Sequence, residues 1–260
     1  MHPLLVPILL LAALLEPEPP QTTGWQLLSA PAGARDVATD ALGNVLLTTT
    51  NGRVWLQRAG GTTWTECSYY TGTEAANLGD SQYPYSIAVN GAVALCTDKV
   101  GHVRKEPFPP PFPQPVGGRW RECGSFQAKD VAVTKSGTRW MVNASGKIYR
   151  APDCSNWEQV SGSDGRRIAA GQDRVWLVNS VGKIYKWNGN GWTQMQGSSV
   201  ADVAVGNDGT VWCTNTDGAI FKFNGLGWNR LAGSDASRIA ADAGSVWMVN
   251  TAGKLYRMYY

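Results

Sequence analysis

The chain has 260 residues and a formal net charge of +3, and only 17% of its residues are charged. This mild charge, without a run of Lys or Arg, argues against a nucleic-acid-binding protein and against a polybasic membrane patch. The 30 glycines and 12 tryptophans instead favour many short strands joined by tight turns.

The N-terminal segment has the pattern of a secretory signal peptide. Residues 2–15 are mostly apolar, and an acidic, proline-rich stretch over residues 16–20 ends the apolar run. The run is too short to span a bilayer comfortably, and nothing later in the chain resembles a membrane helix. We therefore expect a signal peptide over residues 1–20, cleaved between about residue 15 and residue 24, and a secreted, extracellular protein over residues 21–260.

An internal repeat is the strongest feature of the sequence. Tryptophan recurs at positions 25, 64, 120, 157, 192 and 228, each time opening a similar phrase such as WTEC or WEQV. A second phrase, DVAV or RIAA, begins ten residues after each of the last four tryptophans. A third phrase follows it, as in RWMVNASGKIYR at 139–150 and VWMVNTAGKLYR at 246–257. Repeats therefore start near residues 25, 64, 120, 157, 192 and 228.

Each repeat supplies four strand-sized apolar phrases separated by Gly or Asn, which is the pattern of one propeller blade. The sixth repeat lacks its own outer strand, whereas the chain begins with a spare one at Gly24–Leu28. The sequence thus predicts an all-β fold: a six-bladed β-propeller of four-stranded blades, closed by the N-terminal strand. Most tryptophans recur regularly and are expected to pack between blades, whereas Trp55 and Trp187 break the pattern and are freer to be exposed.

The phrase DVAVGNDGTVWCTNTDGAIFKFNGLGW at 202–228 resembles a tectonin repeat. The chain from Trp25 to Tyr260 is similar to fish-egg lectins and to the lipopolysaccharide-binding tachylectin of the same repeat type, closely in repeats three to six and loosely in the first two. The resemblance implies a secreted lectin that recognises N-acetylglucosamine-type glycans or bacterial lipopolysaccharide, with a role in innate defence.

Sugar-binding groups are expected where two sets of loops share one face of the propeller. The loop from the fourth strand to the next first strand carries small hydroxyls and carboxylates, and the turn between strands two and three carries amides and cations. Such groups suit sugar hydroxyls, N-acetyl groups and phosphates. For the asparagines we favour a turn-building role, and for the lysines the two roles are evenly matched. The candidates are Ser163, Asp164, Ser234, Asp235, Asn179, Asn250, Lys147, Lys183 and Lys254.

Asn143-Ala144-Ser145 is the one N-glycosylation sequon, and it falls on this same face. A glycan there would prevent that blade from binding as its neighbours do.

Charge alternates just before the inner strands. The residues are Asp36, Ser86, Asp130, Arg167, Asp202 and Arg238, and closure would bring Arg238 next to Asp36. We expect a structural ring in which neighbouring blades pair these side chains, Asp202 with Arg238 among them. A central polar ligand or ion site is the competing interpretation.

The five cysteines are Cys67, Cys96, Cys123, Cys154 and Cys213. An odd number in an oxidising compartment leaves at least one unpaired, and the pairing is open except that Cys96 and Cys213, on opposed blades, should not bond. No Cys or His cluster indicates a metal site, and no cofactor is expected. Apart from His2, the chain has one histidine, His102, so we expect no enzyme of the Ser-His-Asp type, and we expect a non-enzyme overall.

Two insertions favour an alternative. The Tyr-rich stretch Tyr69–Tyr85 and the Pro-rich stretch Pro107–Pro115 could dock a partner protein, which would make the chain a protein-binding scaffold. A storage or matrix component without a strong ligand is a third possibility. Our main interpretation is a monomeric lectin with several weak sites whose multivalency supplies avidity, binding glycans and neither nucleic acid nor membrane.

Overall fold

The computed structural model describes residues 24–67, 86–90, 93–97, 101–107 and 120–260. The expected signal peptide over residues 1–20 lies outside them, as do the Tyr-rich insertion and all of the Pro-rich insertion except Pro107. Within the described residues every element is a strand, and no helix is available that could cross a membrane.

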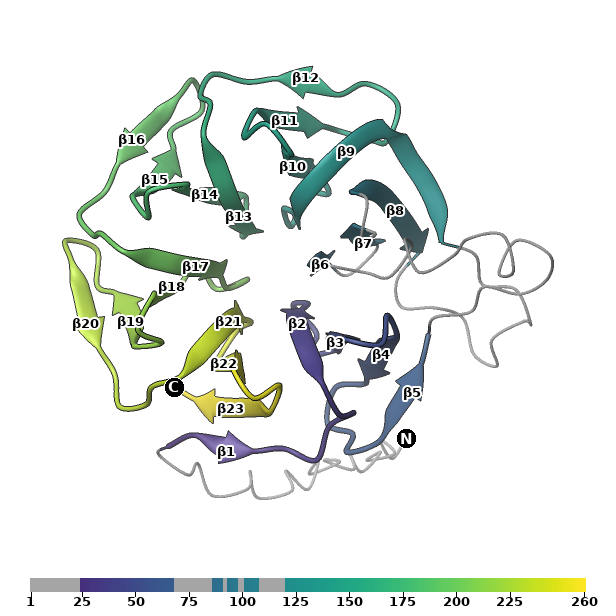
Figure 1. Ribbon diagram of the computed structural model, residues 1–260, viewed down its shortest axis with the longest axis vertical. Coiled ribbons are helices and arrows are strands. Elements are labelled where there is room, and N and C mark those ends of the chain that lie inside the picture. Colours follow the sequence, from purple (N-terminus) through teal and green to yellow (C-terminus); the bar gives the residue numbers. More distant parts are fainter. Residues whose placement is uncertain (1–23, 68–85, 91–92, 98–100, 108–119) are drawn as a thin grey trace, which may run out of the picture.

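Four sheets contain four strands each and are arranged radially around a centre (Figure 1). The first holds β2 (Ala34–Thr39), β3 (Val45–Thr49), β4 (Val54–Gln57) and β5 (Trp64–Glu66). The second holds β13 (Gly165–Gly171), β14 (Arg174–Asn179), β15 (Ile184–Trp187) and β16 (Trp192–Gln194). The third holds β17 (Val200–Val205), β18 (Val211–Asn215), β19 (Ile220–Phe223) and β20 (Trp228–Arg230). The fourth holds β21 (Ala236–Ala241), β22 (Ser245–Asn250), β23 (Leu255–Tyr259) and β1 (Gln26–Leu27).

A seven-stranded sheet completes the arrangement. It contains β6 (Ser86–Val89), β7 (Val93–Thr97), β8 (His102–Pro107), β9 (Arg121–Val133), β10 (Arg139–Asn143), β11 (Ile148–Ala151) and β12 (Glu158–Gln159). The fold is therefore a β-propeller arrangement of four-stranded blades, but the expectation of separate blades throughout is wrong here. The cause is β9, which spans 13 residues: its first part pairs with β8 and its last part with β10.

The N-terminal strand belongs to the fourth sheet. β1 pairs antiparallel with β23, with Gln26 opposite Arg257 and Leu27 opposite Tyr256. The backbone N–H of Leu28 extends this pairing by donating to Leu255 O at 3.0 Å. Strands from the two ends of the described chain thus share one sheet (Figure 1).

Hydrophobic side chains between neighbouring sheets form the core. The second-strand tryptophans are fully buried, as the repeat pattern predicts, with exposures of 1% for Trp176 and 0% for Trp212. Trp176 contacts Phe223 and Trp228 of the next sheet edge-on, at centroid distances of 5.3 and 6.1 Å. The expectation that Trp55 and Trp187 are exposed is wrong, because both are partly buried against the same kind of cluster.

Tryptophans that open the repeats also join neighbouring parts of the propeller by hydrogen bonds. Four of them donate the indole N–H to a carbonyl in the preceding outer connection, at 2.6–3.0 Å: Trp25 to Ala232, Trp64 to Ser29, Trp192 to Ser161 and Trp228 to Gln196. A glycine lies beneath the ring edge in three of these places, and a Cβ on Gly233 would approach Trp25 Nε1 to 2.8 Å. These tryptophans therefore serve packing, and they are not free platforms for sugar stacking.

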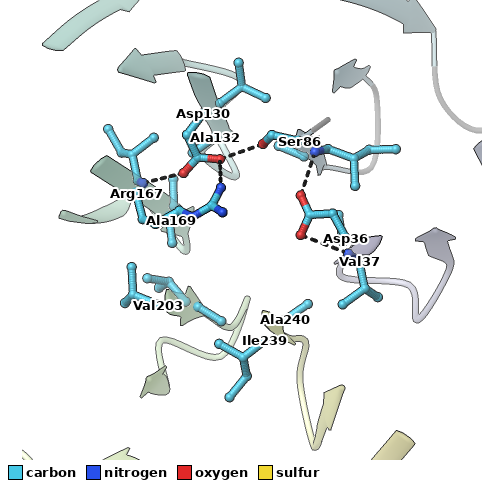
Figure 2. A pocket seen from close by; sticks show the side chains of 18 of the residues that line it. Asp36, Val37, Ser86, Asp130, Ala132, Arg167, Ala169, Val203, Ile239 and Ala240 are labelled. Carbon is cyan, nitrogen blue, oxygen red and sulfur yellow. Dashed lines mark hydrogen bonds and ion pairs between the residues drawn. The ribbon is translucent and has the colours of Figure 1, made fainter. Parts of the chain in front are cut away.

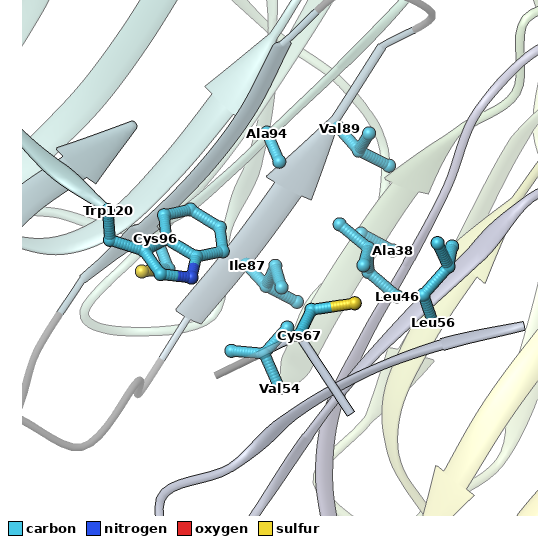
Figure 3. Packing of buried hydrophobic residues seen from close by; sticks show 10 residues of the cluster. All are labelled: Ala38, Leu46, Val54, Leu56, Cys67, Ile87, Val89, Ala94, Cys96 and Trp120. Carbon is cyan, nitrogen blue, oxygen red and sulfur yellow. The ribbon is translucent and has the colours of Figure 1, made fainter. Parts of the chain in front are cut away.

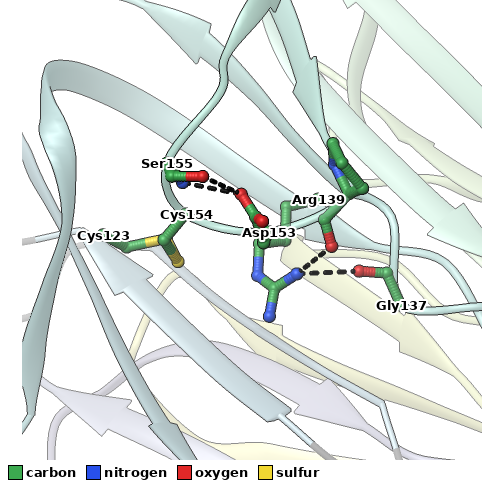
Figure 4. Close-up of a disulfide and its surroundings, with 7 residues drawn as sticks. Cys123, Gly137, Arg139, Asp153, Cys154 and Ser155 are labelled. Carbon is green, nitrogen blue, oxygen red and sulfur yellow. Dashed lines mark hydrogen bonds between the residues drawn. A yellow bond between two sulfur atoms is a disulfide. The ribbon is translucent and has the colours of Figure 1, made fainter.

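Two of the five cysteines are bonded. Cys123 and Cys154 form a disulfide with a Cα–Cα distance of 4.6 Å, beside a loop in which Asp153 accepts hydrogen bonds from the N–H and hydroxyl of Ser155 (Figure 4). No disulfide joins Cys96 to Cys213, in agreement with the expectation that they do not bond to each other. Cys67 and Cys96 are buried in one apolar cluster with Trp120 (Figure 3).

Candidate functional site

Polar side chains gather in two regions of the molecule, and the first region lies at the centre of the propeller. Strands β2, β6, β9, β13, β17 and β21 line a channel pocket of about 80 Å³ (Figure 2). The predicted alternating residues lie at one level of this channel, and we call the following set the channel ring. It consists of Asp36, Ser86, Asp130, Arg167, Asp202 and Arg238.

Each aspartate of the channel ring accepts a backbone N–H from the next inner strand. Asp36 Oδ2 accepts from Ile87 at 3.0 Å, Asp130 Oδ2 from Ile168 at 2.6 Å, and Asp202 Oδ2 from Ile239 at 3.0 Å. All three carboxylates are at most 7% exposed. A buried carboxylate held by backbone donors in this way ties one inner strand to the next.

Side chains of the channel ring also interact directly with one another. Arg167 lies between two carboxylates, with Nη1 3.5 Å from Asp130 Oδ1 and Nε 3.9 Å from Asp202 Oδ1. Arg238 Nε lies 3.7 Å from Asp36 Oδ1, and Ser86 Oγ donates to Asp130 Oδ1 at 2.6 Å.

The expected pairing of the Asp202 and Arg238 side chains is wrong. Asp202 reaches the N–H of Ile239, the residue after Arg238, while the Arg238 guanidinium turns to Asp36 and to the carbonyl of Ser237. The Ile239 N–H thus binds Asp202 where the Arg238 guanidinium was expected.

Burial changes the protonation behaviour of the ring. It raises the pKa of Asp36 to about 7, although Arg238 partly opposes this shift and Asp202 adds to it. Burial likewise raises the pKa of Asp130 against the opposing effect of Arg167. For Arg167, burial lowers the pKa, but the carboxylates of Asp130 and Asp202 outweigh it and raise the pKa overall. The channel ring therefore connects neighbouring inner strands, because its charged groups interact with one another and with backbone amides.

The second region lies on the face where the strand-two-to-three turns emerge. The residue just before an inner strand occupies the same place in four sheets, and we call these four the junction residues: Gly33, Asp164, Ser199 and Asp235. Each carbonyl accepts the N–H of a turn residue in its own sheet at 2.8–3.1 Å: Thr50, Ser180, Thr216 and Thr251 respectively. The next N–H donates at 2.9–3.1 Å to a turn glycine in the preceding sheet: Gly253, Gly146, Gly182 and Gly218 respectively.

All four junction residues have a positive φ, from 57° at Ser199 to 86° at Asp164. Glycine adopts this conformation without strain, whereas a residue with a Cβ does so at a cost of about 1–2 kcal/mol. Asp164 and Asp235 are exposed despite this cost. Because Gly33 and Ser199 share the conformation, the two backbone hydrogen bonds of the junction account for the positive φ, and the carboxylate is the added feature of Asp164 and Asp235.

Two of the sequence-predicted groups meet at each of these aspartates. Asn179 Nδ2 donates to Asp164 Oδ2 at 3.2 Å, and Asn250 Nδ2 donates to Asp235 Oδ2 at 3.0 Å. Thr251 Oγ1 also donates to Asp235 Oδ1. We call Asp164 with Asn179, and Asp235 with Asn250, the two carboxylate notches. The exposed Ser163 and Ser234 directly precede the two aspartates.

The asparagines also build the turns, as the sequence favours. Asn143, Asn179 and Asn250 each accept, through Oδ1 at 2.8 Å, the backbone N–H of the lysine four residues later. Those lysines, Lys147, Lys183 and Lys254, are exposed, and no carboxylate of the described chain lies within ion-pair distance of their ammonium groups. The face thus presents turn-building amides, the exposed carboxylates of Asp164, Asp235 and Asp217, and three solvated cations.

The described residues contain no group of three or more His, Cys, Asp or Glu side chains that could hold a metal ion. Burial raises the pKa of the Cys213 thiol to about 12, so this thiol remains protonated and is a poor nucleophile at neutral pH.

Sequence reasoning missed the junction conformation. It selected Asp164 and Asp235 by residue type, and it did not identify Gly33 and Ser199 as their equivalents. A glycine at the place held elsewhere by Asp was the available indication of a positive φ.

Residues 164–259 match the family model of the Tectonin domain. No curated protein matches the chain. Among solved structures, a protein of unknown function from Bacteroides thetaiotaomicron aligns with a TM-score of 0.62 at 14% identity, over 91% of this chain and 72% of that one. YCF48 bound to D1 peptide aligns with a TM-score of 0.59 at 14% identity, over 91% and 96%. Virginiamycin B lyase from Staphylococcus aureus aligns with a TM-score of 0.55 at 12% identity, over 91% and 88%.

Identities this low establish a shared fold and nothing of activity. The family match covers the β13, β17 and β21 sheets, where the repeat is most regular. Residues 164–259 of the chain thus form a Tectonin domain.

Proposed function

We propose that the chain is a secreted, multivalent lectin that binds N-acetylglucosamine-type glycans or bacterial lipopolysaccharide and serves innate defence. In this proposal it acts outside the cell as a monomer, without catalysis. The tectonin family match and the fish-egg-lectin resemblance of the repeats support the ligand class.

The observation that carries the proposal is the pair of carboxylate notches. Asp164 and Asp235 hold the same strained conformation at equivalent places, and each presents an exposed carboxylate beside an Asn amide. A carboxylate that accepts from two vicinal hydroxyls, beside serine and threonine hydroxyls, suits a sugar ring. Two like sites on one face suit a repetitive surface, because the second contact then forms at a high effective concentration.

We further propose that the propeller has six blades and is closed by the N-terminal strand. In this reading β9 serves as outer strand of one blade and inner strand of the next, so that the seven-stranded sheet holds two blades. The pairing of β1 with β23 supports closure, as does the hydrogen bond from Ala34 N to Gly253 O at 3.1 Å.

The absence of catalysis is part of the proposal. The buried aspartates of the channel ring are occupied by backbone amides and guanidinium groups, and the channel pocket of about 80 Å³ leaves little room for a sugar substrate. These features support binding at the exposed face in preference to chemistry at the centre.

A glycan array with the full chain, collected from the medium of secreting cells, tests the proposal. We expect binding to N-acetylglucosamine oligomers or to lipopolysaccharide core. Silence on the array together with a specific partner in a protein pull-down would defeat it in favour of a protein-binding scaffold.

The lysines define a subsidiary test. A triple Lys147→Ala, Lys183→Ala and Lys254→Ala variant should keep its melting temperature, because all three side chains are exposed and none is engaged by a carboxylate of the described chain. Agglutination of bacteria by this variant should weaken, and more so at low salt, if the face contacts anionic sugars. Unchanged agglutination would remove the lysines from the site.

A further inference from the structure

The turn asparagines are not equivalent in what their amide nitrogens do. Asn179 and Asn250 donate Nδ2 to the junction carboxylates Asp164 and Asp235, and Asn215 donates Nδ2 to Asp217 Oδ2 at 3.3 Å. Asn143 Nδ2 makes no hydrogen bond to any described residue. Its amide nitrogen alone among these four is unengaged.

The pairing register explains the difference. Asn179 lies opposite Gly165 and Asn250 opposite Ala236, each directly after a junction aspartate, whereas Asn143 lies opposite Ala128. The residue before Ala128 is Gln127, which is exposed and has no carboxylate to offer. In all four turns Oδ1 accepts a backbone N–H at 2.8 Å, which holds the amide in one orientation. In two of them, at Asn179 and Asn250, Nδ2 then reaches the junction aspartate of the same sheet.

The same turn is the only one of the four with a hydroxyl residue two positions after the asparagine. Ser145 follows Asn143, whereas Val181, Asp217 and Ala252 occupy that place in the others. Ala144 and Ser145 are exposed, and Asn143 is partly exposed. Sequon and unengaged nitrogen thus coincide in one turn, which is the condition for a glycan to be carried without breaking a hydrogen bond of the fold.

We propose that Asn143 is N-glycosylated and that its glycan covers the junction at Gln127, leaving both carboxylate notches open. The inference rests on the proposed secretion. In the modification, Nδ2 forms a bond to the anomeric carbon of an oligosaccharide carried on a lipid pyrophosphate. The bond from that carbon to the pyrophosphate breaks, the pyrophosphate leaves with the electron pair, and the proton lost by Nδ2 passes to a base.

The position of the glycan follows from the contacts of the Asn143 turn with the two neighbouring junctions. Asp164 is tied to Asn179 within its own sheet and meets the Asn143 turn only through the backbone, by Gly165 N donating to Gly146 O at 2.9 Å. Asn143 itself lies opposite Ala128 in the strand pairing, and Ala128 N donates to Gly101 O at 2.6 Å. The glycan therefore occupies a junction that lacks a carboxylate and blocks neither notch.

The test uses the full chain, expressed behind a strong secretion signal in cultured eukaryotic cells. Peptide N-glycosidase treatment should convert Asn143 to Asp, as read by mass spectrometry of the peptide that contains it. Asn143→Gln and Ser145→Ala should abolish the glycan, and the matched Ser145→Thr variant should retain it. Unmodified Asn143 in the secreted wild-type chain would overturn the proposal.

Binding to an N-acetylglucosamine oligosaccharide tests the placement. Glycosylated wild type and Asn143→Gln should bind within twofold of each other. A larger gain on loss of the glycan would show that it covers a notch and would overturn the placement. Modified Asn143 with no glycan-array binding would instead defeat the lectin proposal while leaving the modification intact.

Discussion

The channel ring and the carboxylate notches use aspartate in opposite ways. In the ring, Asp36, Asp130 and Asp202 are buried, and each accepts a backbone N–H from the next inner strand. In the notches, Asp164 and Asp235 are exposed and hold a conformation that favours glycine. One set stabilises the arrangement of the sheets. The other presents exposed carboxylates at a place where Gly33 and Ser199 form the same junction without one.

The largest effect should come from emptying the ring. Asp130→Ala leaves the Ile168 N–H, the Ser86 hydroxyl and the Arg167 guanidinium without their shared carboxylate. Removing one partner of a buried charge pair costs about 3–5 kcal/mol. Urea denaturation should show this loss, and the exposed control Asp217→Ala should stay within about 0.5 kcal/mol of the wild type. A small effect at Asp130 would mean that the ring does not hold the strands.

A slightly smaller effect should appear as a pH dependence. The folded chain holds a proton on Asp36 up to about pH 7, while the unfolded chain loses it near pH 4. Because the folded pKa is the higher one, the contribution is full below the unfolded pKa and disappears as pH rises through the folded pKa. Between pH 5 and pH 7 the wild type should lose roughly 2–3 kcal/mol relative to Asp36→Asn, at about 1.4 kcal/mol per pH unit.

The difference between the two unfolding free energies, measured at each pH, is the decisive quantity. Groups that titrate alike in both proteins cancel in this difference. The interactions of Arg238, Arg167, Asp202 and Asp130 with the Asp36 carboxylate remain in it, because they help to set its pKa. A pH-independent difference would show that Asp36 is ionised throughout and that Arg238 offsets its burial.

The junction conformation predicts a pair of opposite, smaller effects. Ser199→Gly should raise stability by about 0.5–1 kcal/mol, because it relieves a positive φ without removing a carboxylate. Gly33→Ala should lower stability by about 1–2 kcal/mol, since a Cβ there would press on Thr50 Oγ1 at 2.5 Å. Thermal unfolding of the two variants measures both changes in stability. Changes of the same sign would contradict the shared conformation.

Much of the ring could be predicted from sequence, because residues just before the inner strands recur at a constant distance from the repeat tryptophans. The alternation of Asp130, Arg167, Asp202 and Arg238 follows from that spacing. The hydrogen-bond partners of these aspartates could not be predicted from the spacing. A carboxylate can accept from a backbone amide as readily as from a cation, and Asp202 accepts from Ile239 N. Side-chain type shows which groups can pair and leaves the choice to local geometry.

The carboxylate notches and the extent of β9 could not be predicted from the sequence. Asn179 and Asp164 are separated by 15 positions, and their contact depends on how the turn meets the preceding connection. The continuation of β9 through Gly124–Gln127 was likewise hidden, because a short connection between blades can remain extended and pair along its length. Residue phrases predict strands well, but not where one strand serves two neighbours.

The central claim is that the notches bind sugar, and isothermal titration calorimetry of an N-acetylglucosamine tetrasaccharide tests it most directly. The wild type, an Asp164→Asn/Asp235→Asn double variant and the Ser199→Gly control should be compared at matched salt. A hydrogen bond to a charged group contributes about 1.5–3 kcal/mol, which corresponds to a loss of roughly tenfold or more in affinity for the double variant. The control should bind as the wild type does. Equal affinity in all three proteins would contradict the assignment of the carboxylate notches.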